Sequence, residues 1–175
     1  MKKKIRIILS LFVLIFVFMT TASYAKNYQF EKNFLDIGYE EVNKAVEKSK
    51  KHFKQEIALP LQIPPITFTH NFGRFNNSEG SDNDSLEIKY LNKNTGENHY
   101  QIQVRPIDFK VKFEGEKINR TLKLNDGNDA IYSTAVTGFN ILTFDKNGLQ
   151  YILSLDKKVS DNALEILMDI ANSIS

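Results

Sequence analysis

Short runs of alternating apolar and polar residues fill much of the chain between residues 86 and 155. The first run, residues 86–90, reads Leu-Glu-Ile-Lys-Tyr, and residues 100–105 and 107–113 repeat the pattern. Because successive side chains of a β-strand point to opposite faces of a sheet, this alternation predicts strands with one buried and one solvated face. Further strands are expected near residues 118–124, 131–134, 139–144 and 149–155. The sequence therefore predicts a mainly antiparallel, curved sheet of about six to eight strands, arranged as a meander.

Two amphipathic helices are expected, one before and one after the strand-rich region. Apolar residues recur at helical spacing over residues 39–54 and again over residues 161–173. Prolines at positions 60, 64 and 65 exclude a helix after the first of these and favour extended backbone, which leads into a short strand expected at residues 66–70. An N-terminal helix, a C-terminal helix and an antiparallel sheet together predict the α+β class.

The first 25 residues have the pattern of a signal peptide. Four basic residues within the first six positions precede the apolar run Ile7–Met19, which only Ser10 interrupts. Ser23 and Ala25 then supply the small residues that a signal peptidase requires. We therefore expect cleavage before Lys26, with residues 1–25 as the signal peptide and residues 26–175 as a single domain.

Export predicts a secreted or cell-wall-associated protein. The alternative is a membrane-anchored protein that keeps its signal, but an apolar run of 13 residues is short against the ~20 that span a bilayer. No stable membrane span is expected after cleavage. The chain has no cysteine, which excludes disulfides and a lipid-bearing cysteine and is typical of proteins exported by Gram-positive cells.

Charge argues against nucleic acid as a partner. The signal peptide holds four of the 23 lysine and arginine residues and none of the 21 aspartate and glutamate residues. Its removal changes the formal net charge from +2 to −2, so the exported domain has no general positive field.

No catalytic or cofactor-binding motif stands out. Residues 154–157 fit the S-x-x-K string of serine–lysine acyl enzymes, but they fall in a predicted strand, not at the start of a helix. Asp82, Asp84 and Glu87 resemble a sparse calcium loop, for which a solvated turn is the alternative. We therefore expect no cofactor, and no catalytic or metal-binding residues are assigned.

Two predicted strands carry apolar residues where a half-solvated sheet would be polar. These residues are Leu142 and Phe144 in one strand and Ile152 in the next. Burying each such side chain stabilises a fold by roughly 1.5–3 kcal/mol, so we expect all three to be covered. Either a helix or the N-terminal segment covers them, or they form the floor of a site for an apolar ligand or partner. The sequence therefore makes Leu142, Phe144 and Ile152 the candidate ligand-binding residues.

Two stretches together resemble an uncharacterised family of exported Gram-positive domains. One is Ile57–Pro64, which reads IALPLQIP, and the other is Gly138–Phe144 followed by Gly148–Leu153 and a short amphipathic helix. The resemblance spans most of residues 39–174. Members of this family are distantly similar to periplasmic lipoprotein-localisation proteins, or are appended to membrane-bound regulators. The resemblance implies a half-covered curved sheet that can hold something apolar, and it implies no reaction.

The expected function is that of an exported, non-enzymatic binding or accessory domain of the cell envelope or exterior. Its expected partner is an apolar ligand or a cell-envelope component. The alternative is a small extracellular hydrolase that uses dispersed carboxylates, because aspartate and glutamate are plentiful in the sequence.

Overall fold

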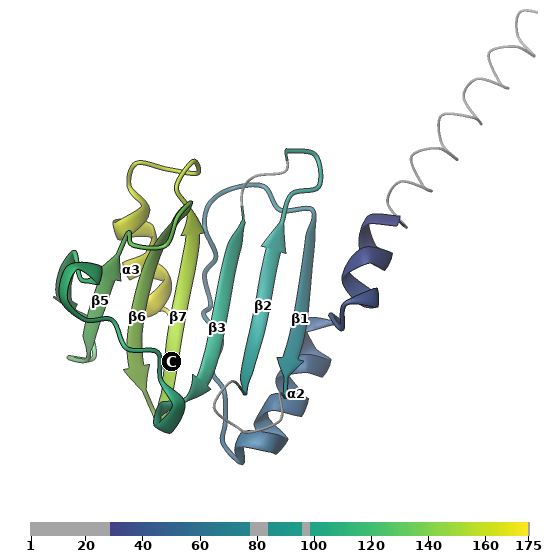
Figure 1. Ribbon diagram of the computed structural model, residues 1–175, viewed down its shortest axis with the longest axis horizontal. Helices are drawn as coiled ribbons and strands as arrows, with labels where there is room; N and C mark the ends of the chain where they lie inside the picture. Colours follow the sequence, from purple (N-terminus) through teal and green to yellow (C-terminus); the bar gives the residue numbers. More distant parts are fainter. Residues whose placement is uncertain (1–28, 78–83, 96–98, 175) are drawn as a thin grey trace, which may run out of the picture. The chain divides into compact units, whose positions relative to one another are not determined.

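A computed structural model describes residues 29–77, 84–95 and 99–174 of the chain (Figure 1). The chain forms two compact units, Met1–Gly38 and Tyr39–Ser175. In the first unit, residues 29–36 are helical, and the rings of Phe30 and Phe34 lie 5.4 Å apart one turn from each other. The expected signal peptide, residues 1–25, lies outside the described residues.

The second unit is built on an antiparallel sheet, which the described residues form from seven strands. Their bounds are β1 (His70–Asn76), β2 (Ser85–Leu91), β3 (Tyr100–Pro106), β4 (Arg120–Lys123), β5 (Asp129–Ser133), β6 (Phe139–Lys146) and β7 (Leu149–Asp156). The spatial order is β1-β2-β3-β7-β6-β5-β4. Two meanders, β1–β3 and β4–β7, therefore meet where β3 pairs with β7. The predicted α+β class and the antiparallel sheet are confirmed.

A two-residue turn joins β6 to β7, as the sequence predicts. Asn147 and Gly148 have φ values of 50° and 76°, the left-handed conformations that an Asn-Gly hairpin turn requires. This tight turn fixes the register of the hairpin, in which Phe144 pairs with Tyr151 and Leu142 pairs with Leu153.

Both helices of this unit cover the same face of the sheet (Figure 1). Helix α2 (Val42–Phe53) lies over β1 and β2, and α3 (Ala163–Asn172) lies over β6 and β7. An extended segment that includes Ile57 and Ala58 packs on the core as well. This helix face supplies the core, whose largest fully buried strand residues are Leu86, Ile88, Tyr100, Ile102, Leu142, Leu149, Tyr151, Leu153 and Leu155.

The close approach of α2 to β1 depends on Gly73. A Cβ atom at position 73 would lie 2.7 Å from the Cβ of Ala45 and 2.9 Å from the Cα of Val42. Gly73 also exchanges two backbone hydrogen bonds with Glu40, at 2.8 and 2.9 Å, at the edge of the sheet. A glycine here lets the helix backbone contact the strand backbone directly.

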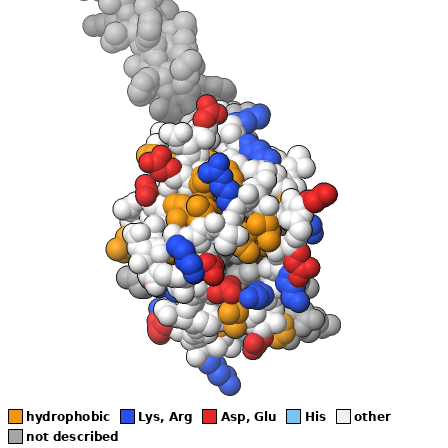
Figure 2. All heavy atoms as spheres, turned by 90° about the vertical axis from the view of Figure 1, so that its left-hand side faces the viewer, with side chains coloured by type: hydrophobic (Ala, Val, Ile, Leu, Met, Phe, Trp, Pro, Cys, Tyr) orange, Lys and Arg blue, Asp and Glu red, His pale blue; other side chains and the backbone are white. Residues whose placement is uncertain are grey.

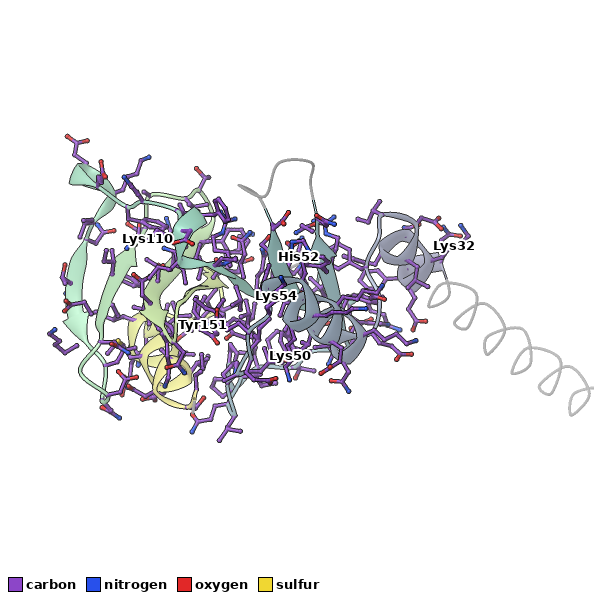
Figure 3. All side chains as sticks on the ribbon, turned by 90° about the horizontal axis from the view of Figure 1, so that it is seen from below. Lys32, Lys50, His52, Lys54, Lys110 and Tyr151 are labelled. Carbon is purple, nitrogen blue, oxygen red and sulfur yellow. The ribbon has the colours of Figure 1, made fainter. Side chains whose placement is uncertain are left out.

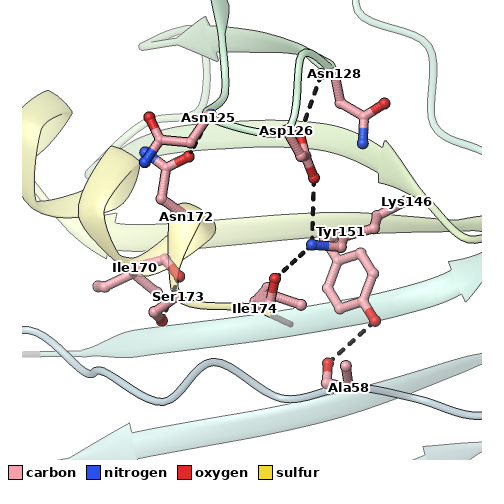
Figure 4. Close-up of polar contacts among 10 residues, drawn as sticks. All are labelled: Ala58, Asn125, Asp126, Asn128, Lys146, Tyr151, Ile170, Asn172, Ser173 and Ile174. Atoms are coloured by element: carbon pink, nitrogen blue, oxygen red, sulfur yellow. Dashed lines mark hydrogen bonds and ion pairs between the residues drawn. The ribbon is translucent and has the colours of Figure 1, made fainter.

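The end of the chain is tied to the turn between β4 and β5 (Figure 4). The ammonium group of Lys146 donates a hydrogen bond to the carbonyl oxygen of Ile174 and lies 3.2 Å from Oδ2 of Asp126. The amide nitrogen of Asn125 donates to Oδ1 of Asn172 at 2.8 Å. These contacts hold the last turn of α3 against the sheet.

Two strand predictions are wrong. The first predicted strand, residues 66–70, is non-strand up to its last residue, where β1 begins. Residues 107–113 alternate like a strand but form a 3₁₀ turn, Ile107–Phe109, and then extended backbone outside the sheet. Here Pro106 ends β3, and the position beside β3 that this segment would take belongs to β7. We call residues 107–119 the strap, because they run from β3 at the centre of the sheet to β4 at its edge.

None of the helices in the described part of the chain combines the length and the apolar character that a membrane span requires.

Candidate functional site

The strand register separates the three candidate residues of the sequence analysis. Directly paired side chains of an antiparallel ladder share a face of the sheet. Leu142 and Phe144 pair with Leu153 and Tyr151 and therefore lie on the helix face, whereas Ile152 pairs with Thr143 on the other face. The three residues therefore do not share one face of the sheet.

Leu142 and Phe144 belong to the core. Leu142 is fully buried, and Phe144 is 2% exposed. The ring of Phe144 stacks on the ring of Tyr151, with centroids 5.3 Å apart and planes 5° from parallel. Ile152 is also buried, but on the opposite side of the sheet. The elements packed on the helix face therefore cover Leu142 and Phe144.

A cavity of about 360 Å³ lies on the other face, between the strap and the sheet. We call this side, which carries Thr143, Gln150 and Ile152, the strap face. Figure 3 shows the labelled Lys110 of the strap on the side of the sheet away from α3. The residues that line the cavity include Val111 and Phe113 of the strap, Ile131 of β5, Thr143 of β6 and Gln150 of β7. Phe144 also borders it, although its ring is stacked on Tyr151.

The side-chain amide of Gln150 holds the strap over this cavity. The backbone N–H of Val111 donates to Oε1 of Gln150 at 2.8 Å, and Nε2 of Gln150 donates to the carbonyl oxygen of Val111 at 2.9 Å. One side chain thus supplies both hydrogen bonds that a neighbouring strand would otherwise make to this residue.

Three weaker contacts secure the near end of the strap. Nη1 of Arg105 donates to the carbonyl oxygen of Phe109 at 3.2 Å, and the amide of Ile107 donates to the carbonyl oxygen of Gly148 at 3.0 Å. Lys110 forms an ion pair of 3.0 Å with Asp145, and both side chains are about 40% exposed. The strap is therefore attached near its beginning.

Charges of both signs surround the cavity. Lys110 is paired with Asp145, and Asp129 is paired with Lys123 at 2.7 Å. Lys112 and Glu114 also line the cavity. The rim therefore has no strong excess of one charge, whereas Val111, Phe113 and Ile131 make part of the lining apolar.

Thr143 places an unsatisfied hydroxyl group at the cavity. The residue is 3% exposed, and its Oγ1 atom has no hydrogen-bond partner in the part of the chain that the structure describes. A buried polar atom without a partner loses its hydration without compensation, which typically costs about 1–3 kcal/mol. In the present position of the strap this oxygen is shielded from solvent, although Thr143 lines the cavity.

A second hollow of about 580 Å³ lies between α3 and the edge strands β4 and β5. Leu122, Tyr132, Leu164 and Met168 line it, together with Arg120 and two acidic residues of the α3 end. Figure 2, which views this edge of the sheet, shows hydrophobic side chains among charged ones. This hollow is more open to solvent than the cavity under the strap.

A histidine–carboxylate pair joins the end of α2 to the start of β2. Nε2 of His52 lies 2.6 Å from Oδ2 of Asp84, whose side chain is 4% exposed. His52 packs beside the ring of Phe75, 4.9 Å between centroids. No hydroxyl nucleophile is hydrogen-bonded to His52 within the described residues, so the pair has no serine or threonine partner there.

In the described residues, the acidic side chains that resemble a calcium loop do not form a cluster of ligands. Asp84 contacts His52, and the carboxylate of Glu87 lies 2.7 Å from Nη2 of Arg74 and 3.3 Å from Nζ of Lys89. Asp82 lies outside the described residues. Over residues 29–77, 84–95 and 99–174, no three histidine or acidic side chains come together as metal ligands.

No protein-family model, curated protein or solved structure matches this chain. Sequence analysis missed the cavity because the strap has the alternation of a strand, and nothing in the sequence marks Gln150 as different from other polar strand residues.

Proposed function

We propose that the unit Tyr39–Ser175 is an exported, non-enzymatic binding domain of the Gram-positive cell envelope that holds a small amphipathic molecule beneath the strap. The observation that carries the proposal is the cavity itself, which the sheet borders on one side and the strap on the other. The resemblance to exported domains with a half-covered sheet supports the same interpretation.

The size and lining of the cavity suit such a ligand. Small-molecule sites typically enclose about 300–1,000 Å³ and combine apolar walls with a few polar groups. A volume of about 360 Å³ lies at the small end of this range. Val111, Phe113 and Ile131 would contact the apolar part, and the polar part would meet the charged rim.

Binding of the dye anilinonaphthalene sulfonate tests the proposal, because the fluorescence of this amphipathic probe rises in apolar sites. Ile131→Asp places a charge in the apolar lining, and we expect it to weaken dye binding by about tenfold or more. The reason is that an isoleucine contact contributes roughly 1.5–3 kcal/mol, and 1.4 kcal/mol is tenfold in affinity. Met168→Asp in the second hollow is the matched control and should leave the affinity unchanged. Equal dye binding by the wild type and Ile131→Asp, or its loss only in Met168→Asp, would contradict the proposal.

The export part of the proposal has a separate test. Protein recovered from the culture medium should begin at Lys26, as N-terminal sequencing would show. Recovery of only the full-length chain, in the membrane pellet, would instead favour the anchored alternative.

A small extracellular hydrolase is the second candidate function, and the His52–Asp84 pair is the observation that favours it. A buried carboxylate that orients a half-exposed histidine is one arrangement for a general base. If the domain hydrolyses an ester or amide, His52→Ala should abolish the activity. Activity that survives this substitution would exclude the pair as its base.

A further inference from the structure

We infer that the strap is a gate to the cavity, closed by the amide of Gln150 and biased towards opening by the buried hydroxyl of Thr143. The inference rests on the proposed function in one respect, because the gate matters only if a ligand enters the cavity. The opening of the strap itself can be measured without any ligand.

The closed position depends on few contacts. Between Lys110 and Glu114 the strap makes no backbone ladder with the sheet, and two hydrogen bonds to Gln150 replace it. The ion pair between Lys110 and Asp145 is solvated and contributes little. Val111 remains 38% exposed even in the closed position, and Phe113 is only partly buried, so neither side chain is anchored in the core.

The ends of the strap suit a hinged motion. Pro106 and Arg120, which flank it, belong to β3 and β4 and are fixed in the sheet. Gly115 within it has φ of 59°, and a side chain added there would meet open space. The strap is therefore tied at both ends, and a change at a few backbone positions can lift its middle.

Thr143 opposes closure. Its hydroxyl has no partner beside the closed cavity within the described chain, whereas water or the polar group of a ligand could satisfy it once the strap lifts. Closed and open positions thus exchange one set of polar contacts for another: Gln150 favours the first and Thr143 the second. A few-fold change in the equilibrium constant of either contact shifts the populations of the closed and open positions.

Two substitutions by apolar residues of similar size should move the gate in opposite directions. Gln150→Leu removes both hydrogen bonds to Val111, and we expect amide hydrogen exchange in the strap to become about five- to tenfold faster. Thr143→Val removes the unsatisfied hydroxyl without changing the shape of the side chain, and we expect the same amides to exchange several-fold more slowly. Exchange in β6 and β7 should stay unchanged in both variants, which controls for general loosening.

Val111→Pro is the second opening variant, in case Gln150→Leu fails to fold. Proline removes only the N–H that donates to Gln150, and the extended backbone of Lys110, with ψ of 143°, accepts a following proline. The remaining amides of the strap should again exchange several-fold faster than in the wild type.

Stopped-flow mixing with anilinonaphthalene sulfonate links the gate to binding. In the full chain, Gln150→Leu should raise the association and dissociation rates of the dye together, and Thr143→Val should lower both. Strap exchange that is unchanged in Gln150→Leu and Val111→Pro, or faster in Thr143→Val, would overturn the gate. A wild-type chain that binds no dye would instead contradict the proposed function, because the exchange comparison is made without dye.

Discussion

The hydroxyl group of Tyr151 donates a hydrogen bond of 3.1 Å to the carbonyl oxygen of Ala58 (Figure 4). This bond joins a central strand to the extended segment that crosses the helix face. Tyr100, on the neighbouring strand β3, is fully buried on the same face, but its hydroxyl has no partner among the described residues. Two buried tyrosines thus differ in a single hydrogen bond.

Removing the two hydroxyl groups should therefore have different effects on stability. Tyr151→Phe leaves the Ala58 carbonyl without its partner and should lower the free energy of unfolding by about 1–2 kcal/mol. Tyr100→Phe removes an unsatisfied buried group and should be neutral or stabilise the fold by up to about 1 kcal/mol. Urea unfolding of the two variants and the wild type measures both values. Equal losses in both variants would show that the Ala58 bond is not what distinguishes them.

The same two tyrosines predict a loss of stability at alkaline pH. Burial raises the pKa of Tyr151 to about 12, and burial with the nearby Tyr90 raises the pKa of Tyr100 well above its ordinary value. In the unfolded chain both ionise near pH 10, so the unfolded state loses protons first, and the free energy of unfolding falls as the pH rises above about 10. Unfolding curves between pH 8 and 11 should show this slope, and it should be shallower in Tyr100→Phe. A slope unchanged by the substitution would mean that Tyr100 does not contribute to it.

Local sequence patterns correctly predicted the hairpin turn and the two helices. These elements depend on local contacts or on one buried apolar stripe. The Asn147–Gly148 turn and the helices at residues 42–53 and 163–172 appear where turn chemistry and helical spacing place them. The helix ends differ by a few residues, because periodicity marks the buried stripe and not the terminal residues, and the N-caps of α2 and α3 make no side-chain hydrogen bond. Just before α3, Oγ of Ser160 accepts a hydrogen bond from the amide of Asn162.

The strap shows what alternation alone does not determine. Residues 107–113 satisfy the strand pattern, but a strand also needs a neighbour in the ladder, and β7 occupies that place beside β3. The pairing of β3 with β7 depends on residues about 50 positions apart in sequence, which no local signal records. The register of β6 and β7 likewise decided that Phe144 and Ile152 lie on opposite faces. The cavity depends on the pairing of β3 with β7 and on the register of β6 and β7, so local sequence patterns could not predict it.

Gly73 should be intolerant of even the smallest side chain. In Gly73→Ala the new methyl group would meet Ala45 and Val42 at less than 3.0 Å, so α2 must move away from β1. Overpacking of this kind typically costs about 1–3 kcal/mol in the free energy of unfolding. Asn71→Ala, two residues earlier on the same face and exposed, is the control and should change stability by less than about 0.5 kcal/mol. Thermal unfolding that does not distinguish the two variants would contradict this contact.

Glu87 should contribute stability at neutral pH that is lost in acid. Burial alone would raise its pKa, but Lys89, Arg74 and Tyr39 outweigh this and lower it below the ordinary value of 4.5. Because the unfolded state then takes up protons at a higher pH than the folded state, the contribution is present above about pH 4.5 and is lost as the pH falls through the lowered pKa.

Glu87→Gln tests this contribution directly. It should destabilise the domain by about 1–3 kcal/mol at pH 7, less than in a fully buried pair because Arg74 and Lys89 are each 30% exposed. The variant and the wild type should become more alike below pH 4. If the difference in the free energy of unfolding between the variant and the wild type stays constant across the acid range, the loss comes from packing and not from charge.

Phe144→Ser separates the two roles that the sequence left open for this residue. Because Phe144 is 2% exposed and its ring stacks on Tyr151, we expect a loss of about 3–5 kcal/mol in the free energy of unfolding, as for other buried phenylalanines. Ile131→Ser, in the cavity lining but only partly buried, should cost less than half as much and should weaken dye binding. Calorimetry with and without anilinonaphthalene sulfonate measures both effects. A stable Phe144→Ser protein that has lost only dye binding would place the ligand against the helix face and would contradict the assignment of Phe144 to the core.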